Sequence, residues 1–229
     1  MKTVGIIGGL GPEATAKFYL EIVSACSNRG EQTHPPILIY SVPLPLQIEK
    51  ECIINGQSEE KCVPFLIQAA KTLEQGGADF LVMPCNSLHV FIEEIRKAVK
   101  IPVLSIVEET IKFLKNHNIK QVGILATSIT INRGLYKSQL NTQGIIEVIP
   151  NDKDQTKLGQ IIYNLVIGKY TDEDKQIFDE ITENLVNKEV ESIILACTDL
   201  QLLAPRHTKI AIYDTMQILV DATVREIIK

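Results

Sequence analysis

The chain has 229 residues, of which 45% are hydrophobic and 22% are charged. This composition is typical of a folded protein with a sizeable core. The formal net charge of −5 leaves no basic surplus to pair with phosphates, so the sequence argues against nucleic-acid binding. No apolar stretch approaches the ~18 residues of a membrane span, and we expect no membrane partner.

The number and spacing of the cysteines and histidines indicate in which cell compartment the protein works and whether it binds a metal ion. Five cysteines are an odd number, and the glycine-broken N-terminal segment lacks a signal-peptide core, so a disulfide framework is not expected. We therefore predict a cytoplasmic protein with free thiols. No C-x-x-C spacing occurs and the four histidines are scattered, so no metal site is predicted.

Apolar runs rich in valine and isoleucine alternate with amphipathic segments along the chain. The strands that we predict lie at residues 3–8, 37–42, 79–84, 102–106, 121–126, 146–149, 192–196 and 210–213. The helices that we predict lie at residues 14–28, 62–75, 89–98, 107–116, 134–143, 155–167 and 173–188, with a last helix after the final strand. This alternation is typical of α/β proteins, in which crossover helices cover both faces of parallel sheets.

The first predicted strand ends in a glycine turn, GGLGPEA at 8–14. Gly9, Gly11 and Ala14 formally fit the dinucleotide-binding fingerprint. That interpretation requires an acidic residue near the end of the second strand, where the chain reads LIYSVPLP instead. The alternative is a tight turn that leaves room for a small ligand, with Gly9 as a contact and Pro12 as the first helical residue.

Two strands of the first half of the chain recur in the second half. TVGIIGG at 3–9 resembles QVGILAT at 121–127, an offset of 118 residues. ADFLVMPC at 78–85 resembles VESIILAC at 190–197, an offset of 112 residues. We therefore predict two similar Rossmann-like halves with parallel sheets and an active site in the cleft between them.

The predicted halves divide the chain at two places. The first domain is expected to comprise residues 1–100 together with 210–229, because the last helix should return to pack on the first half. The second domain is expected to comprise residues 101–209.

Cys85 and Cys197 end the second of the repeated strands in each half. Ligands of open parallel sheets bind beyond the carboxyl ends of the strands, so both thiols are expected at the cleft, on opposite sides of the ligand. Inversion of a carbon beside a carboxylate needs a base on one face and an acid on the other. A pair of equivalent thiols suits this chemistry.

Each of these cysteines precedes residues that are suited to helix capping. Asn86 or Ser87 can cap the helix after the first cysteine, and Thr198 or Asp199 the short segment after the second. A helix N-terminus lowers the pKa of a thiol and binds carboxylates, so both effects are expected here.

The other cysteines lack this placement. Buried cysteine is a common core residue, and we predict structural roles for Cys26, Cys52 and Cys62.

Several motifs together resemble the aspartate/glutamate racemase family. They are GGLGPEAT at 8–15, PCNSLH at 84–89, LAT followed by RGLY between 125 and 136, ACTDLQLL at 196–203 and YDT at 213–215. They are spread over essentially the whole chain. The resemblance implies an amino-acid racemase without a cofactor, acting on a small amino-acid substrate as a homodimer.

The resemblance also implies roles for individual residues. Cys85 and Cys197 would be the catalytic bases, one for each enantiomer. The residues implied for substrate binding are Asn86 and Ser87 at the α-carboxylate, Thr127 from the second half and Thr198 beside the second cysteine.

Two neighbouring residues each have two open roles. Asp199 stands where the family usually has glutamate, and it would either meet the substrate ammonium or influence Cys197. His89 lies about one helical turn after Cys85, and it would either tune the thiolate or lie on the helix surface.

The side-chain pocket departs from the family pattern. Aspartate-specific members have an arginine in the segment that begins like YS.P, whereas YSVPLPLQIEKECI has none. Val166 stands about where a lysine is expected, with Lys169 three positions further on, and Ile129 replaces a usual glycine. Without a cationic partner a buried second carboxylate is costly. SVPLPLQIE is closer to the broad-specificity branch and GGLGPEAT to the aspartate branch, so aspartate and neutral amino acids both stay open.

Two other interpretations also stay open. One is an isomerase or decarboxylase of a dicarboxylic acid, and the other is a non-catalytic small-molecule binding protein on the same scaffold.

Overall fold

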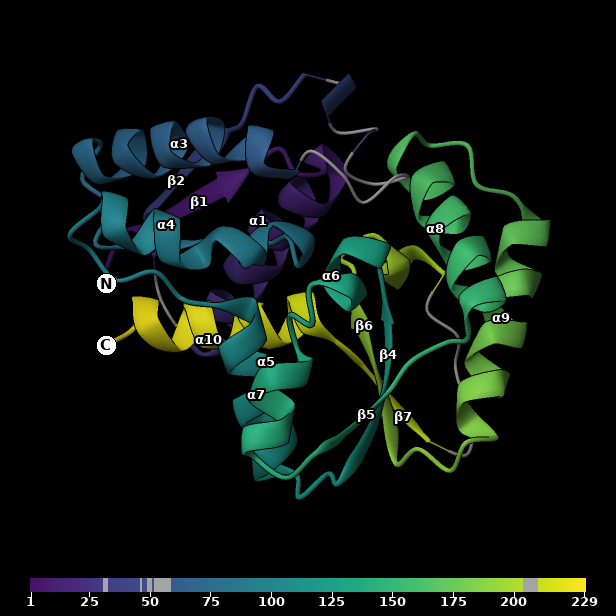
Figure 1. Ribbon diagram of the computed structural model, residues 1–229. Helices are drawn as coiled ribbons and strands as arrows, with labels where there is room; N and C mark the ends of the chain where they lie inside the picture. Colours follow the sequence, from purple (N-terminus) through teal and green to yellow (C-terminus); the bar gives the residue numbers. More distant parts are fainter. Residues whose placement is uncertain (31–32, 46, 49–50, 52–58, 204–209) are drawn as a thin grey trace.

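A computed structural model describes residues 1–30, 33–45, 47–48, 51, 59–203 and 210–229, and it contains two parallel sheets (Figure 1). The first sheet has the order β2-β1-β3 and consists of β1 (Val4–Gly8), β2 (Ile37–Ser41) and β3 (Phe80–Val82). The second has the order β5-β4-β6-β7 and consists of β4 (Gln121–Ala126), β5 (Ile146–Val148), β6 (Ser192–Ala196) and β7 (Ala211–Asp214). The predicted α/β class with parallel sheets is confirmed.

Helices connect the strands and cover the sheets (Figure 1). The α-helices are α1 (Pro12–Asn28), α3 (Val63–Gln75), α4 (Ile92–Ala98), α5 (Ile106–Asn116), α6 (Ser128–Asn132), α7 (Lys137–Thr142), α8 (Asp152–Val166), α9 (Asp172–Val186) and α10 (Thr215–Ile227). Short 3₁₀ segments are η2 (Glu59–Cys62), η3 (Ser87–Phe91) and η4 (Leu200–Leu202). Pro12 is the first residue of α1, as the sequence predicts.

The two sheets have matching strand order and register. The strand β1 lies between β2 and β3, as β4 lies between β5 and β6. Val4 pairs with Phe80, and Val122 pairs with Ser192. The offset of 118 relates Val4 to Val122, and the offset of 112 relates Phe80 to Ser192. The internal repeat of the sequence is therefore also a repeat of structure.

A glycine within each central strand lets the helix that precedes the neighbouring strand pack directly on the sheet: α3, before β3, packs at Gly5, and α9, before β6, packs at Gly123. An added Cβ would meet three equivalent residues in the two halves: Leu81, Ala78 and Leu73 at 2.6–3.1 Å from Gly5, and Ile193, Val190 and Leu185 at 2.9–3.6 Å from Gly123. Because the six neighbours are related by the same offset of 112, the packing around the sheet is duplicated together with the strands.

Replacing Gly5 by alanine is expected to destabilise the protein by about 1–3 kcal/mol, because the added methyl group overpacks this contact. Gly159 is a matched control: it lies inside α8 and an added Cβ meets nothing within 4 Å. Gly159→Ala is expected to stabilise by about 1 kcal/mol, the helix-propensity difference. Urea unfolding measures both, and a Gly5→Ala variant as stable as the wild type would contradict the packing described.

Three predicted elements differ from those observed. The predicted helix 89–98 starts within the 3₁₀ segment η3, and α4 begins only at Ile92. The predicted strand 102–106 is reduced to one bridge, between Val103 and Leu81, because Ser105 caps α5 and ends the extended segment. The predicted helix 134–143 is shortened to α7, because Gly134 has φ of +59° and the helix begins only at Lys137; the short α6 before it was not predicted.

The last helix brings the two ends of the chain together. Helix α10 packs against α1 and α5, and the N–H of Lys2 donates to the carbonyl of Ile227 at 2.8 Å (Figure 1). Strand β7 nevertheless pairs with β6 in the second sheet, although the predicted first domain includes its residues. The rest of the division into two domains stays a prediction.

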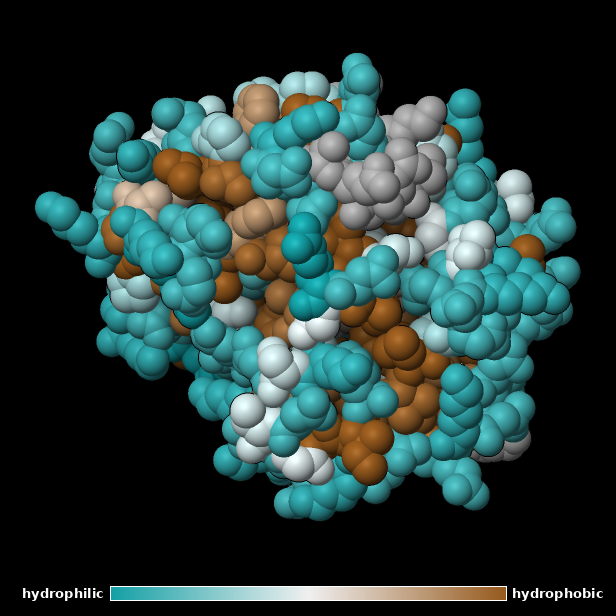
Figure 2. Space-filling model, viewed as in Figure 1, coloured by the Kyte–Doolittle hydropathy of each residue, from teal (hydrophilic) through white to brown (hydrophobic). Residues whose placement is uncertain are grey.

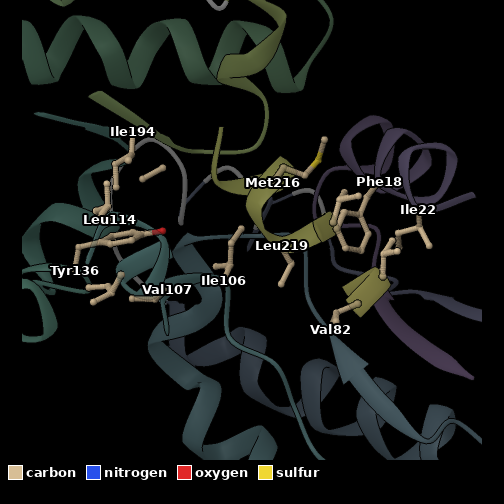
Figure 3. Close-up of a cluster of buried hydrophobic side chains, with 14 of the residues drawn as sticks. Phe18, Ile22, Val82, Ile106, Val107, Leu114, Tyr136, Ile194, Met216 and Leu219 are labelled. Carbon is tan, nitrogen blue, oxygen red and sulfur yellow. The ribbon is translucent and has the colours of Figure 1, made fainter. Parts of the chain in front are cut away.

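Side chains from both sheets share one buried core. Phe18 and Ile22 of α1 contribute to it, as do Val82 of the first sheet and Ile194 of the second (Figure 3). Their burial, about 1.5–3 kcal/mol for each large side chain, stabilises the two halves together. On the outside, apolar surface gathers across the middle of one face and is rimmed by hydrophilic side chains (Figure 2). Within the described residues, no helix has the length and apolar composition needed to cross a bilayer.

Candidate active site

A pocket lies at the carboxyl ends of the central strands of both sheets. Its walls come from the segments that follow β1, β2, β3, β4 and β6, together with residues from η2 and α8. It encloses about 610 Å³, part of which is open to solvent.

The pocket brings together most of the residues that the sequence singled out. The predicted site residues among those that line it are Cys85, Asn86, Ser87, Thr127, Cys197, Thr198 and Asp199. Gly9 is not among the lining residues, whereas Leu10 and Gly11 are. Gly9 instead shapes the turn: its φ is +80°, and its N–H donates to Oγ1 of Thr15 at 2.9 Å. A ligand contact at Gly9 stays a prediction, and the contacts of Gly9 in the structure are those of a turn residue.

The turn after each cysteine meets the turn after the first strand of the other half. Oγ of Ser87 lies 2.7 Å from Oγ1 of Thr127. On the other side, a Cβ added to Gly11 would lie 3.4 Å from Oδ1 of Asp199. Each cysteine turn therefore contacts the other half of the chain, and both turns line the same pocket. That the two thiols lie on opposite sides of a ligand stays a prediction.

Cys197 is a buried thiol beside a carboxylate. Its side chain donates to Oδ2 of Asp199 over 3.9 Å, and the residue is 7% exposed. Burial raises the pKa of Cys197 well above its usual value, and the charges of Asp199 and Cys85 raise it further. This corrects the expectation of a lowered pKa. The helix invoked there is only the three-residue η4, whose N-cap Asp199 makes no side-chain capping bond.

Asn86 belongs to a buried polar network instead of capping a helix. Its Oδ1 accepts from the hydroxyl of Tyr136, and its Nδ2 donates to Oγ1 of Thr215 at 3.0 Å. The Thr215 hydroxyl in turn donates to the carbonyl of Leu195 at 2.8 Å. The predicted cap at Asn86 is wrong, because both ends of its amide are bound to the core. Only one hydrogen of Nδ2 is left for a ligand.

Tyr136 and Thr215 also contribute to the site through Asn86, and the sequence pattern does not predict this role. Both lie in motifs quoted above, RGLY and YDT, but neither motif shows that a hydroxyl reaches Asn86. Their contacts link residues 50 and 129 positions apart in the chain. Contacts between residues so far apart in the chain can be seen only in the folded structure.

Apolar side chains form most of the remaining wall. They are Leu10, Leu44, Leu88, Ile129, Ile162 and Val166. Val166 is the position at which the family pattern expects a lysine, and Lys169 is exposed. Among the described residues, the lining contains neither arginine nor lysine.

The other two cysteines that the structure describes lie in different surroundings. Cys26 is buried in the core of α1, whereas Cys62, for which a structural role was predicted, lines the pocket. Cys52, Arg206 and His207 lie outside the described residues. Within the part of the chain that the structure describes, no group of His, Cys, Asp or Glu side chains could hold a metal ion.

Comparison with known proteins gives the same family throughout. The Asp/Glu/Hydantoin racemase family matches residues 7–223. The broad specificity amino-acid racemase RacX of Bacillus subtilis is 31% identical over 226 residues, which is 96% of each chain. The Picrophilus torridus aspartate racemase structure has a TM-score of 0.82 at 27% identity, over 99% of this chain and 94% of that one. An aspartate racemase homologue from Pyrococcus horikoshii has a TM-score of 0.81 at 26% identity, over 100% of both chains. The racemases to which the chain is similar are isomerases, and the chain belongs to the Asp/Glu/Hydantoin racemase family.

Proposed function

We propose that this protein racemises neutral amino acids without a cofactor, with Cys85 and Cys197 as the acid and base. The observation that carries the proposal is that two cysteines at equivalent strand ends line one pocket. A further support is RacX, a broad specificity amino-acid racemase by its name, which is similar over 96% of both chains.

Hydroxyl groups supply the site for the substrate α-carboxylate. The Ser87 and Thr127 hydroxyls lie 2.7 Å apart at the pocket. Thr198 and the remaining N–H of Asn86 add donors. When the α-proton leaves, negative charge spreads into the carboxylate, and fixed donors around it stabilise this charge.

The two thiols exchange roles as the reaction turns over. Because burial and Asp199 keep Cys197 protonated, Cys197 acts as the acid in a turnover in which Cys85 is the thiolate. The Cys85 thiolate takes the α-proton, so the C–H bond breaks and an S–H bond forms. Cys197 then delivers its proton to the opposite face of the carbanion and becomes a thiolate, ready for the reverse direction.

Asp199 is the proposed partner of the substrate ammonium. It is the charged side chain among the described lining residues, and it is 9% exposed. An ammonium next to it would neutralise its charge beside Cys197. Substrate binding would then remove one of the effects that hold the thiol protonated, so it prepares Cys197 for its turn as the base.

The apolar wall favours a neutral substrate side chain. Ile129, Ile162 and Val166 present hydrocarbon to the pocket. A second carboxylate placed against them would be desolvated without a cationic partner, at a cost of several kcal/mol. The same argument disfavours the dicarboxylic-acid isomerase and decarboxylase.

Chiral chromatography on both enantiomers of alanine, methionine, leucine, aspartate and glutamate tests this substrate class. We expect the neutral amino acids to be racemised faster than the acidic ones. Val166→Lys is expected to shift the preference towards the acidic substrates by roughly tenfold or more, because a partnered carboxylate contributes about 1.5–3 kcal/mol. Ile167→Lys is the matched control, since Ile167 is 40% exposed and does not line the pocket. A wild-type enzyme restricted to aspartate would contradict the proposed substrate.

The cytoplasmic location and the homodimer are also part of the proposal. Both come from the sequence, the first from its cysteine content and the second from the family resemblance. Sedimentation velocity on the purified full chain tests the dimer, and a single monomeric boundary at micromolar concentration would contradict it.

A further inference from the structure

The ring of His89 is buried next to the first cysteine and bonded at both nitrogens. It is 1% exposed, so the alternative of a helix-surface residue is wrong. Its Nδ1 lies 2.6 Å from the carbonyl oxygen of Cys85, and the N–H of Ile106 donates to its Nε2 at 3.2 Å. A backbone N–H can only donate and a carbonyl can only accept. The partners therefore fix one neutral tautomer, with the proton on Nδ1.

The surroundings of His89 keep this tautomer neutral. Burial lowers the pKa of His89 to about 4, assisted by Arg96 and opposed by the Cys85 carbonyl and Glu108. A proton added at Nε2 would also point at the N–H of Ile106. His89 thus supplies no cation to Cys85, and its contribution is the position of the Cys85 backbone.

Among the described residues of the second half, the position equivalent to His89 makes a different contact. The offset of 112 places Gln201 at the position of His89, and its Nε2 donates to Sδ of Met216 at 3.6 Å. The carbonyl of Cys197 accepts the backbone N–H of Leu200 instead, at 3.1 Å. A side chain therefore holds the first cysteine turn, whereas the backbone holds the second.

Ile106, the outer partner of His89, belongs to the shared core. It is fully buried and is the first residue of α5, which packs against α10. The N–H groups in the first turn of a helix have no partner within the helix. The His89 ring uses one of them to join the Cys85 turn to a rigid element.

We propose that His89 is a positioning residue for racemisation, which holds the Cys85 carbonyl and thereby keeps the Cys85 thiol at its face of the substrate. This inference rests on the proposed function of Cys85. It assigns to His89 no contact with the substrate.

Two substitutions separate the two hydrogen bonds of the ring. His89→Asn places an amide N–H near Nδ1 and can keep the bond to Cys85, whereas His89→Gln places its amide near Nε2 and keeps only an acceptor for Ile106. Partners that orient catalytic metal ligands contribute about 10–100-fold, and we expect His89→Gln to lower kcat by an amount in this range. His89→Asn should stay much closer to the wild type. Gln201→Leu, at the equivalent position of the other half, is the control and should leave kcat unchanged.

Two readouts distinguish positioning from a general loss of stability. The first is the rate of iodoacetamide alkylation at Cys85 relative to Cys197, mapped by mass spectrometry, which should change in His89→Gln and not in Gln201→Leu. The second is ¹⁵N NMR of the histidines in the wild-type protein, which requires no variant to fold and should show His89 protonated at Nδ1 at neutral pH.

The inference is overturned by an Nε2-protonated ring, by full kcat in His89→Gln, or by equal losses in both variants that follow their melting temperatures. A fully active Cys85→Ser variant would instead overturn the proposed function itself. An inactive Cys85→Ser variant beside a fully active His89→Gln variant would refute the inference about His89 alone.

Discussion

Replacing either Cys85 or Cys197 by serine is expected to lower racemisation by at least about 10³-fold. A serine hydroxyl is a far weaker acid than a thiol, so it cannot form the base for one enantiomer or return the proton for the other. Both variants should lose both directions, because each turnover needs one group on each face. Loss of a nucleophile or base from a catalytic set has effects of about 10⁴–10⁶-fold in well-studied enzymes.

Cys26→Ala is the control for this pair, because Cys26 is buried in the core of α1 and does not line the pocket. It should cost stability without changing kcat per folded molecule. Chiral chromatography of the product gives the rates, with circular dichroism to establish that each variant is folded. Racemisation retained by both single serine variants would refute the two-base mechanism and leave the binding protein as the better interpretation.

Replacing Asp199 by asparagine is expected to move two observables in opposite directions. The variant loses the partner of the substrate ammonium, so kcat/KM should fall by about 10–100-fold, the value of a charge-assisted hydrogen bond of 1.5–3 kcal/mol. At the same time Cys197 loses the carboxylate that raises its pKa. Cys197 should therefore be alkylated faster in the free variant than in the wild type, at any pH below its pKa.

Thr198→Ser is a control of similar size in the same turn, since it keeps the hydroxyl and leaves the charge next to Cys197 unchanged. Alkylation with iodoacetamide over a range of pH, followed residue by residue, gives the thiol readout. If activity and Cys197 reactivity fall together in Asp199→Asn, the carboxylate supports the structure of the turn, and the assigned electrostatic role is wrong.

The sequence predicted the architecture well where the pattern is local and repeated. The register that relates Val4–Phe80 to Val122–Ser192 follows from two offsets that can be read from the residues. The strand predicted at 102–106 is only a single bridge at Val103. The apolar pattern of these residues does not show that Ser105 caps the next helix and so ends the extended segment.

The sequence predicted which residues gather at one pocket better than it predicted the pKa of Cys197. Seven of the eight predicted residues line the pocket, all but Gly9. The direction of the pKa shift of Cys197 was predicted wrongly for two reasons. The segment after Cys197 is a single 3₁₀ turn and not a helix N-terminus. The burial of the thiol depends on residues that are distant in the chain. The network of Asn86, Tyr136 and Thr215 joins three distant segments, and no local pattern encodes such contacts.

Proton NMR in D₂O on a single enantiomer of a neutral amino acid tests the two-base mechanism most directly. A thiol exchanges its proton with the solvent before it acts as the acid, so the product enantiomer formed early should carry deuterium at the α-carbon. The remaining substrate should still carry mostly protium, because its own proton returns from the same side. Protium retained in the early product would mean that one group both removes the α-proton and returns it to the opposite face of the α-carbon, which contradicts the two-base mechanism. If folded and reduced protein neither exchanges the α-proton nor inverts any neutral or acidic amino acid, the proposed racemisation is contradicted.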